Sequence, residues 1–511
     1  MRIARPLILG VAASLALPGC IFFFDLIGTP PATTTDTSPD DTSPPPPLCL
    51  QQEAVDQGQI EYLTPKVSVN PGTYAVLSDA PPPSTALPSG FARNDYYGAV
   101  DPEGPAWWGE WTYRGSVDGG FPGGFFHPLE REIRDGVIVP ASTSRCGPMG
   151  FTDAGEVDVF GASFPVCAIT ETILSDTELT NDHVYLLGGS IRVGTGDRPL
   201  GGGPLPPRVN LAIEAGTQIY GTSGTLAALV ITRGSRIQAR GTAQQPIVMG
   251  ALEAYPTTTY NLIFGDPTNL SSRGLWGGLV LSGRGELNTS VGSDYGEAQS
   301  PSTAAFQPRF FGGGTNEGSS GFLNYVVIAE AGALAQAQTR LDALTLEAVG
   351  SATTIDYVQM LGSDGDCLRA FGGAPKVSHL VCNGPRDDGI DLEFGFTGQI
   401  QWALVRFGTF GGQRGLESDS NPDNYVASPV TAARIANFTV LGGGPAFSET
   451  VAAVHRTGAR DRVYRAAYAE GPQVFSGGCF DVDDTLADEL RYVDSLFSCS
   501  PQPIHPCGDD G

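Results

Sequence analysis

The sequence predicts an all-β solenoid, and three observations support this fold class. Short β-branched and leucine-rich runs recur between residues 166 and 470, and many of them end at a glycine. No stretch of this region sustains the 3.6-residue apolar period of an amphipathic helix, whereas apolar residues often alternate as in a strand. Equivalent runs begin at Ile355, Val377 and Ile400, which are 22 and 23 residues apart. A strand–turn unit of this length that repeats and stacks is typical of a β-solenoid.

Several of these runs resemble a group of secreted bacterial β-helix proteins and lipoproteins. They read IEAGTQIYG, VITRGSRIQARGTAQQPIVM, WGGLVLSGRGELN and TIDYVQMLGSDGD, and the resemblance covers residues 180–410. Members of the group share the right-handed parallel β-helix fold of the pectate lyases. The resemblance therefore implies a right-handed parallel β-helix, which we assign to residues 166–470. It implies little about activity, because a fold does not determine a function.

The N-terminus has the features of a bacterial lipoprotein. Residues 1–19 combine a basic start, small residues and an apolar stretch too short to span a bilayer, as in a secretory signal peptide. The run LPGC, which ends at Cys20, resembles the lipobox in which the cysteine is acylated. Ile21 follows instead of Asp, which by the same resemblance favours the outer membrane. Residues 28–47 are rich in Pro, Thr, Ser and Asp, so we expect residues 20–47 to form a lipid anchor and a disordered tether. The alternative is an ordinary signal peptide with an incidental cysteine.

Two regions flank the repeats and are expected to cover the ends of the solenoid. Residues 48–165 are rich in Gly, Pro and aromatic residues and are predicted to form an irregular N-terminal cap. Residues 471–511 are predicted to form a cysteine-containing C-terminal cap, in which a helix over residues 483–497 presents one apolar face.

Aromatic side chains suggest a second kind of site. Trp107, Trp108 and Trp111 would stack sugars if they were exposed, but large aromatic residues more commonly serve packing, which is the interpretation we favour. Equivalent places in successive repeats are occupied by Tyr357, His379 and Trp402. These three side chains should form a column, and the alternation along the strands leaves open whether the column is core or exposed.

The chain is strongly acidic. It has 29 basic and 55 acidic residues and a formal charge of −26. Removal of residues 1–19 takes away two arginines, so the mature charge becomes 27 − 55 = −28. A nucleic acid or an anionic lipid surface is therefore not expected as the main partner, whereas cations, neutral glycans and basic proteins remain open.

The cysteine content predicts disulfides. Apart from Cys20 the chain has eight cysteines, an even number that is typical of disulfide bonding in an exported protein. The local pairs Cys146–Cys167 and Cys479–Cys499 are predicted, and the other pairings remain open.

The run GPRDDGIDLE, residues 384–393, carries the densest group of carboxylates. Alignment of the repeats places Asp366 directly beneath Asp388, and Arg369 beneath Asp391. We therefore expect one turn of the solenoid to gather five aspartates, namely Asp364, Asp366, Asp387, Asp388 and Asp391.

Three interpretations of this cluster compete. Asp and Gly at solenoid corners form turns because Asp accepts hydrogen bonds from nearby backbone and Gly adopts positive φ, which is the interpretation we favour. Stacked carboxylates also suit Ca²⁺, for which Asp366, Asp387 and Asp388 are the candidate ligands. Catalysis by paired carboxylates is the third interpretation. The cluster resembles that of the β-helix polygalacturonases, but the Gly-His-Gly and Arg-Ile-Lys motifs that follow in that family are missing here.

These features lead to an expected function. We expect an outer-membrane lipoprotein, facing the periplasm or the cell surface, whose β-helix serves as a binding, adhesion or envelope-structural module. Membrane contact is expected only through the N-terminal lipid, with a glycan or an envelope protein as partner. The alternative is a hydrolase or lyase that acts on polyuronates through the aspartates. Such substrates are anionic, so this alternative requires a local concentration of arginines or a bridging Ca²⁺.

Overall fold

The structure is a computed structural model, and the residues that it describes lie within Pro47–Gly511. These residues are 60–63, 66–70, 72–113, 127–254, 260–262, 273–289, 296–300, 309–336, 339–408, 412–442, 450–470, 475, 477–482 and 489–499. The signal peptide, Cys20 and the tether lie outside the described residues. Within the described part of the chain, no helix combines the length and the apolar character that a membrane span requires.

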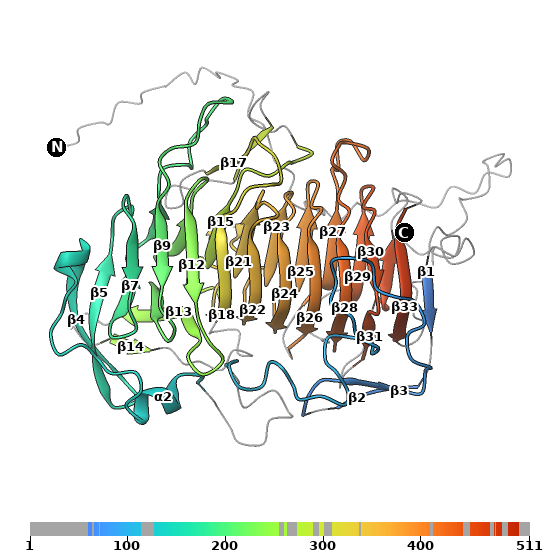
Figure 1. Ribbon diagram of the computed structural model, residues 1–511, viewed down its shortest axis with the longest axis horizontal. Coiled ribbons are helices and arrows are strands. Elements are labelled where there is room, and N and C mark those ends of the chain that lie inside the picture. The colour runs from blue at the N-terminus through green and yellow to red at the C-terminus, as the bar shows by residue number, and fades with distance from the viewer. Residues whose placement is uncertain are drawn as a thin grey trace, which may run out of the picture. The chain divides into compact units, whose positions relative to one another are not determined.

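Two sheets make up most of the fold (Figure 1). The first has eighteen strands: β1 (Ile60–Leu63), β4 (Thr152–Val159), β5 (Ala162–Ile169), β6 (Thr177–Leu179), β7 (Val184–Leu187), β9 (Asn210–Ile213), β10 (Gln218–Thr222), β12 (Arg236–Arg240), β13 (Ile247–Ala254), β14 (Tyr260–Leu262), β18 (Gly321–Ala329), β22 (Thr354–Leu361), β24 (Lys376–Asn383), β26 (Gln399–Arg406), β28 (Arg434–Leu441), β30 (Arg462–Tyr464), β31 (Ala467–Ala469) and β33 (Arg491–Ser498). The second has nine strands: β8 (Ser190–Val193), β11 (Ala228–Ile231), β15 (Leu279–Ser282), β21 (Leu344–Glu347), β23 (Leu368–Phe371), β25 (Ile390–Glu393), β27 (Arg414–Asp419), β29 (Val451–Arg456) and β32 (Phe480–Val482).

The smaller elements lie outside the two sheets. Antiparallel pairs are formed by β2 (Val67–Val69) with β3 (Val76–Ser78), β16 (Glu297–Gln299) with β17 (Phe310–Gly312), and β19 (Leu334–Gln336) with β20 (Thr339–Arg340). The helices are one short α-helix, α2 (Glu130–Arg134), and one 3₁₀ turn, Gly147–Met149, among the residues that the structure describes.

The register of the strands confirms the repeat that the sequence predicts. Ile355 of β22 pairs with Val377 of β24, which pairs with Ile400 of β26, and all of these pairings are parallel. The nine strands of the second sheet also pair in parallel, with Leu368 of β23 beside Ile390 of β25. Each of these rungs therefore supplies one bent strand to the first sheet and one short strand to the second, which is the arrangement of a parallel β-helix.

The bend within each long strand is made by one residue in the left-handed conformation. Tyr357, His379 and Trp402 have φ of 55°, 48° and 58°, and the ladder pairing skips each of them. Positive φ is uncommon for residues with large side chains, so its recurrence at one place in each rung marks a built-in corner. The three side chains stack on the outside of this corner, with ring centroids 4.1 and 4.6 Å apart. The predicted aromatic column is therefore present, and its rings are half-buried.

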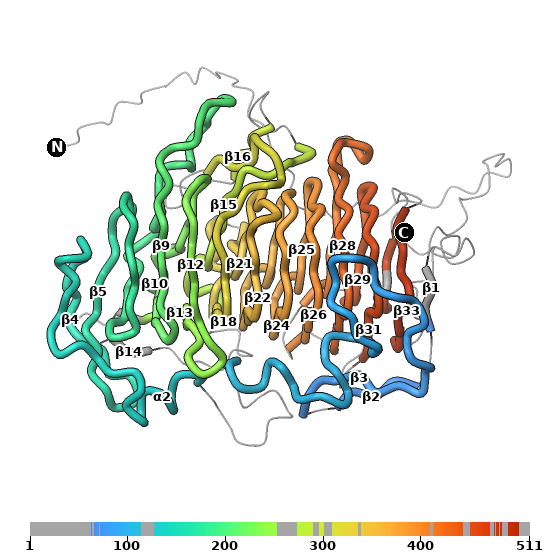
Figure 2. Tube along the Cα trace, in the orientation of Figure 1, coloured from blue at the N-terminus to red at the C-terminus, as the bar shows by residue number. Residues whose placement is uncertain are grey.

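The N-terminal region is placed differently from the cap that the sequence predicts. Strand β1 pairs in parallel with β33, on the last rung, at the end of the solenoid opposite β4 (Figures 1 and 2). Residues 72–113, which we call the N-terminal strap, then run back along the outer surface of the first sheet. Thr85 donates its N–H to Asp494 at 2.7 Å, whereas the N–H of Tyr113 reaches Gln359 at 2.7 Å, several rungs away.

The strap is held because it covers apolar side chains that point outward from the rungs. Trp108 and Trp111 of the strap belong to one buried cluster with side chains of the rungs such as Leu361, Val381 and Leu404. The outer surface of a solenoid strand is normally polar, so a repeated apolar position there requires a cover. The region predicted as an N-terminal cap therefore serves mainly as this cover.

The opposite end of the solenoid is covered by a hairpin. Strands β4 and β5 pair in antiparallel fashion, and β5 continues in parallel onto β7, the next strand of the sheet. The disulfide Cys146–Cys167 links the segment before β4 to β5. This part of residues 48–165 therefore lies at the end of the solenoid opposite β1.

The prediction of a helix over residues 483–497 is wrong for the part of this range that the structure describes. Residues 491–498 form strand β33, which pairs in parallel with β30 and β31 and carries Tyr492 and Phe497 into the core. The apolar spacing fits a helical face as well as a strand, and pairing with the preceding rung decides between them. The disulfide Cys479–Cys499 is present as predicted.

A third disulfide joins Cys367 and Cys382, whose pairing the sequence analysis left open. Cys382 lies on β24 and Cys367 directly precedes β23, and both side chains are fully buried in the main core. The bond thus crosses the interior and connects the two sheets.

Candidate functional site

Four of the five predicted aspartates lie at the turn that leads from the first sheet into the second, whereas Asp391 lies on strand β25. Two of them form a ladder with Asp342: the N–H of Asp366 donates to Oδ1 of Asp342 at 3.2 Å, and the N–H of Asp388 donates to Oδ1 of Asp366 at 2.9 Å. Oδ1 of Asp388 then accepts the N–H of Arg414 at 2.8 Å. Each carboxylate therefore satisfies a backbone donor of the next rung, which is the turn chemistry that the sequence favours.

The predicted stacking of Asp366 beneath Asp388 is thus observed, but the ladder includes Asp342, which the sequence analysis missed. A signal was available, since Asp342 precedes β21 by the same two residues by which Asp366 and Asp388 precede β23 and β25. The step from Asp342 to Asp366 is 24 residues, outside the 22–23-residue register.

Asp366, Asp387 and Asp388 form a compact group of carboxylates. One oxygen of each lies within 4.8 Å of the other two. Ca²⁺ takes oxygen ligands at about 2.3–2.6 Å, so these three oxygens can contact one ion, with the rest of its six to eight ligands supplied by other groups. Asp366 and Asp388 are buried and Asp387 is half-buried. The donor set therefore fits Ca²⁺, which would neutralise part of the charge here.

Arg369 compensates a second group of carboxylates on the outer surface of the second sheet. It lies directly beside Asp391 in the register of β23 and β25, and its Nε is 3.2 Å from Oδ2 of that residue. The same guanidinium contacts Glu393 and lies 3.6 Å from Asp366. Further along, Arg414 pairs with Glu417 at 3.0 Å. Asp391 is therefore part of a charge network on the sheet surface and not of the turn.

Asp364 stands apart from the other four predicted aspartates. It accepts hydrogen bonds from Nε of Arg340 and from Nη1 of Arg386, each at 2.9 Å. The structure thus divides the predicted cluster into the turn group, the Arg369 network and Asp364 with its arginines.

Burial and mutual repulsion favour the neutral form of these carboxyls. Burial raises the pKa of Asp342 to about 6 and the pKa of Asp388 to about 7. Burial also raises the pKa of Asp366 well above its usual range, and the neighbouring carboxylates of Asp342 and Asp387 raise it further. For Asp391, burial and then the charge of Glu393 raise the pKa.

These shifts predict a pH-dependent stability. The carboxyl pKa of Asp388 rises from about 3.9 in the unfolded chain to about 7 in the fold, so the folded state binds its proton more tightly. Its contribution to the free energy of unfolding is fully present below about pH 4 and is lost as the pH rises towards about 7. Urea unfolding of Asp388→Asn should give a shallower decline over this range, with a more stable variant at about pH 8. Parallel profiles for both proteins would contradict the assignment.

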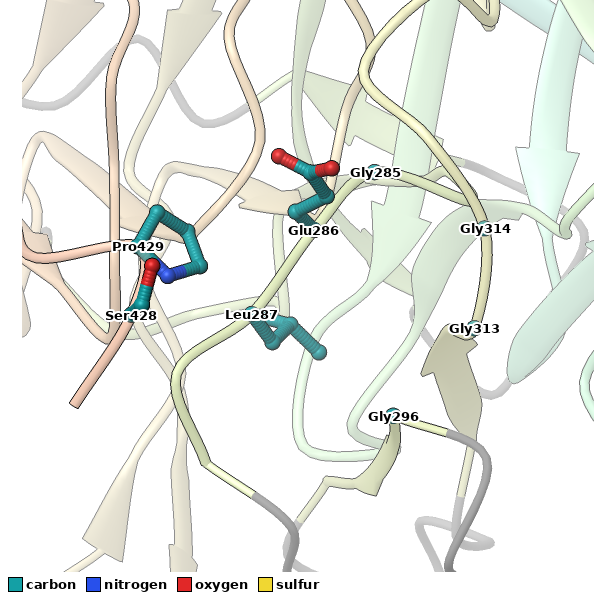
Figure 3. Close-up of a pocket in the computed structure, with 8 residues that line it drawn as sticks. All are labelled: Gly285, Glu286, Leu287, Gly296, Gly313, Gly314, Ser428 and Pro429. Atoms are coloured by element: carbon teal, nitrogen blue, oxygen red, sulfur yellow. The ribbon is translucent and has the colours of Figure 1, made fainter.

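The carboxylates at the turn are close together. One oxygen of each of Asp366, Asp387 and Asp388 lies within 4.8 Å of the other two. The catalytic carboxyls of glycosidases are about 5–5.5 Å apart in retaining enzymes and about 6.5–9.5 Å apart in inverting ones. A cavity of about 260 Å³ lies elsewhere, between the loop after β15 and the loop before β28 (Figure 3). It is lined by four glycines with Glu286, Leu287, Ser428 and Pro429, and by none of the five aspartates.

The burial of two of the three tryptophans favours the packing interpretation over sugar stacking. Trp108 and Trp111 are 3% and 1% exposed. Trp107 is half-buried and makes an edge-to-face contact with His379, with ring centroids 5.0 Å apart. Its Nε1–H donates to the carbonyl of Ala99. Their ring faces are used within the protein, because the strap must cover the apolar surface beneath it.

Comparison with known proteins agrees with this architecture. The family model described as "Pectate-lyase like beta helix domain" matches residues 172–489. No curated protein and no solved structure matches the chain. The matched segment includes the turn group, the Arg369 network and Asp364 with its arginines. Since it covers more than half of the chain, the protein belongs to the pectate-lyase-like β-helix domain family.

Proposed function

We propose that the protein is an exported lipoprotein, anchored in the outer membrane through Cys20, whose β-helix acts as a rigid binding module at the cell envelope. The run LPGC and the Pro/Thr/Ser-rich residues that follow support the anchor and tether. Three disulfides support an oxidising compartment, because such bonds persist outside the cytosol. The proposed partner is a neutral glycan or an envelope protein, in keeping with the acidic charge.

One observation carries the choice of binding over catalysis. Asp364, Asp366, Asp388 and Asp391 are each already engaged by an arginine or by a backbone N–H of the fold. A general acid or base must reach a proton of the substrate, which requires an accessible carboxyl. Carboxyls used in this way stabilise turns and sheet surfaces, so the module offers a preformed surface whose shape is fixed by its rungs.

A polyuronate hydrolase or lyase is the second candidate. The observation in its favour is the raised pKa of Asp388, to about 7, since perturbed carboxyls are common in active sites. The same shift follows from burial in a turn without catalysis.

One comparison tests the anchor and the activity together. Wild-type protein, extracted from membranes with detergent, and the Cys20→Ser variant, taken from the soluble fraction, are incubated with neutral glycans and with polyuronates, each with and without Ca²⁺. We expect both proteins to bind the same neutral glycan in calorimetry and neither to release reducing ends or unsaturated products.

If the wild type turns over a polyuronate and Asp388→Asn abolishes this activity, the protein is an enzyme and the proposed binding function is wrong. A Cys20→Ser variant that remained in the membrane fraction would overturn the anchor and leave the binding result unaffected. A rise in melting temperature with Ca²⁺, without turnover, would assign the turn group to the ion.

A further inference from the structure

Two cysteines of the sequence remain to be assigned once the disulfides of the described residues are counted. The chain carries eight cysteines after Cys20, and six of them form the pairs Cys146–Cys167, Cys367–Cys382 and Cys479–Cys499. The other two are Cys49 and Cys507, which lie outside the described residues. In an oxidising compartment, two such cysteines are expected to form a disulfide with each other or with another molecule.

The fold brings the two chain segments that carry these cysteines to the same end of the solenoid. Strand β1 pairs in parallel with β33, and Ile60 lies beside Tyr492 (Figure 1). Cys49 precedes Ile60 by 60 − 49 = 11 residues. Cys507 follows Cys499, the residue directly after β33, by 507 − 499 = 8 residues. The two cysteines are therefore 507 − 49 = 458 residues apart in sequence, but they are attached to neighbouring strands.

The lengths of the two connecting segments allow the cysteines to meet. An extended chain spans at most about 3.6 Å per residue, so the two segments reach up to about 40 and 29 Å. The seven residues from Tyr492 to Cys499, at about 3.3 Å each, separate the two starting points by roughly 23 Å. The combined reach exceeds this separation more than twofold, so the cysteines meet without any movement of β1 or β33.

Pairing of Cys49 with Cys507 is favoured over pairing with a different molecule. Two groups that short segments hold on neighbouring strands have an effective concentration in the millimolar range, and a thiol of another protein competes only at a comparable concentration. Five of the six cysteines in the other disulfides are at most 1% exposed. Their burial protects these bonds from exchange with the two remaining thiols.

We propose that Cys49 and Cys507 form a fourth disulfide, which we call the latch, between the end of the tether and the segment that follows the last rung. The latch forms by thiol–disulfide exchange with an oxidising donor protein. One S–S bond forms between the two cysteines, and their two electrons and two protons pass to the disulfide of the donor, which becomes a dithiol. The latch rests on the proposed export of the protein, but not on the proposed binding of a glycan or an envelope protein.

The latch would protect the attachment of the N-terminal region to the last rung. Strand β1 has only four residues, and the tether enters the ectodomain through the residues that precede it. A pull on the lipid anchor would otherwise act first on the pairing of β1 with β33. With the latch in place, residues 49–507 form one closed covalent loop, and the load passes to the disulfide.

The test counts thiols in the full-length Cys20→Ser variant, here the parent protein, which retains eight cysteines. The parent protein is taken from the soluble fraction, unfolded without reductant and labelled with a maleimide. We expect no labelled cysteine in the parent, a labelled Cys507 after Cys49→Ser, a labelled Cys49 after Cys507→Ser, and no label when both are replaced. In a tryptic digest without reductant, the peptide that ends at Lys66 should be joined to Tyr492–Gly511, and reductant should separate the two.

Cys146→Ser is the matched control for the labelling. It breaks a disulfide that the structure shows, at the end of the solenoid opposite β1, so Cys167 should take up one label. The melting temperature of each variant checks that it was folded before it was labelled.

Hydrogen exchange tests the mechanical role of the latch. Without the latch, a local opening of β1 releases a longer free segment, so the amides of β1 should exchange about threefold faster or more in Cys49→Ser/Cys507→Ser than in the parent. The amides of β24, in the middle of the sheet, should exchange at the parent rate. Cys146→Ser/Cys167→Ser should leave the exchange of β1 unchanged. Equal exchange of β1 with and without the latch would overturn its protective role.

The outcomes for the disulfide are distinct. If the folded parent carries two labels, on Cys49 and Cys507, the latch is wrong and the other three disulfides stand. A reductant-sensitive dimer that Cys49→Ser abolishes would replace the latch with a bond between two copies of the chain. Labels on all eight cysteines would contradict the proposed export, and the latch would fall with it.

Discussion

Trp111→Ala should destabilise the protein by about 3–5 kcal/mol, the range for truncation of a buried aromatic side chain. Trp111 is 1% exposed and packs edge-on against Tyr325 and Tyr357, with ring centroids 5.6 and 6.1 Å apart. Its Nε1–H donates to the carbonyl of Trp107 at 3.0 Å, so the substitution removes both packing and a fixed turn of the strap. Urea unfolding followed by circular dichroism measures the loss.

Trp107→Ala serves as the comparison within the same strap. The side chain of Trp107 is half-buried, so Trp107→Ala should lower the free energy of unfolding clearly less than Trp111→Ala does. Glycan binding by both variants should equal that of the wild type if they remain folded, because neither ring is offered to a ligand. A cost below about 1 kcal/mol for Trp111→Ala would mean that the strap is not a firmly bound part of the fold.

Replacement of Arg369 by methionine has the second of the two largest expected effects, a loss of about 3–5 kcal/mol near pH 7.5. The guanidinium lies among Asp366, Asp391 and Glu393, and its Nε is 2.9 Å from Oε1 of Glu393. Methionine preserves most of the volume but leaves these carboxylates without their cation. Because burial already raises the carboxyl pKa of Asp366 and Asp391, protonation near pH 5 should remove much of the penalty.

Arg131→Met provides the control for the loss of a surface arginine. Arg131 is 79% exposed and lies 3.8 Å from Glu132 and from Asp135, so its removal should change the free energy of unfolding by less than about 0.5 kcal/mol. If Arg369→Met destabilises the protein equally at pH 7.5 and at pH 5, the loss comes from packing and not from carboxylates left without a cation.

Much of the fold was predictable because residues that pair between adjacent rungs are separated by only one repeat in the sequence. Ile355, Val377 and Ile400 stand one repeat apart, and residues one repeat apart pair directly in the sheet. The same spacing places Asp366 beneath Asp388 and forms the aromatic column at His379. A period in the sequence therefore carries the register and the stacking of side chains with it.

The candidate site was predictable only in part. Its turn position followed from the register, but the contacts of Asp364 did not. Arg340 belongs to the hairpin of β19 and β20 beside the rung, so it has no place in the repeat. Likewise the Cys367–Cys382 bond joins positions on different sheets of the solenoid, and spacing along the chain does not report a contact across the core.

The sequence by itself determined the β-helix, its 22–23-residue register and the residues that stack at its corners, because each of these depends on neighbours one rung away. The tertiary structure alone decided that β1 joins the last rung, that residues 72–113 cover the outer surface, and that residues 491–498 form a strand. Thr85 contacts Asp494 across 409 residues of sequence, and Asn94 contacts Asn437 across 343. Such contacts depend on which apolar surface is left uncovered after the rungs have stacked, and no local pattern encodes that surface.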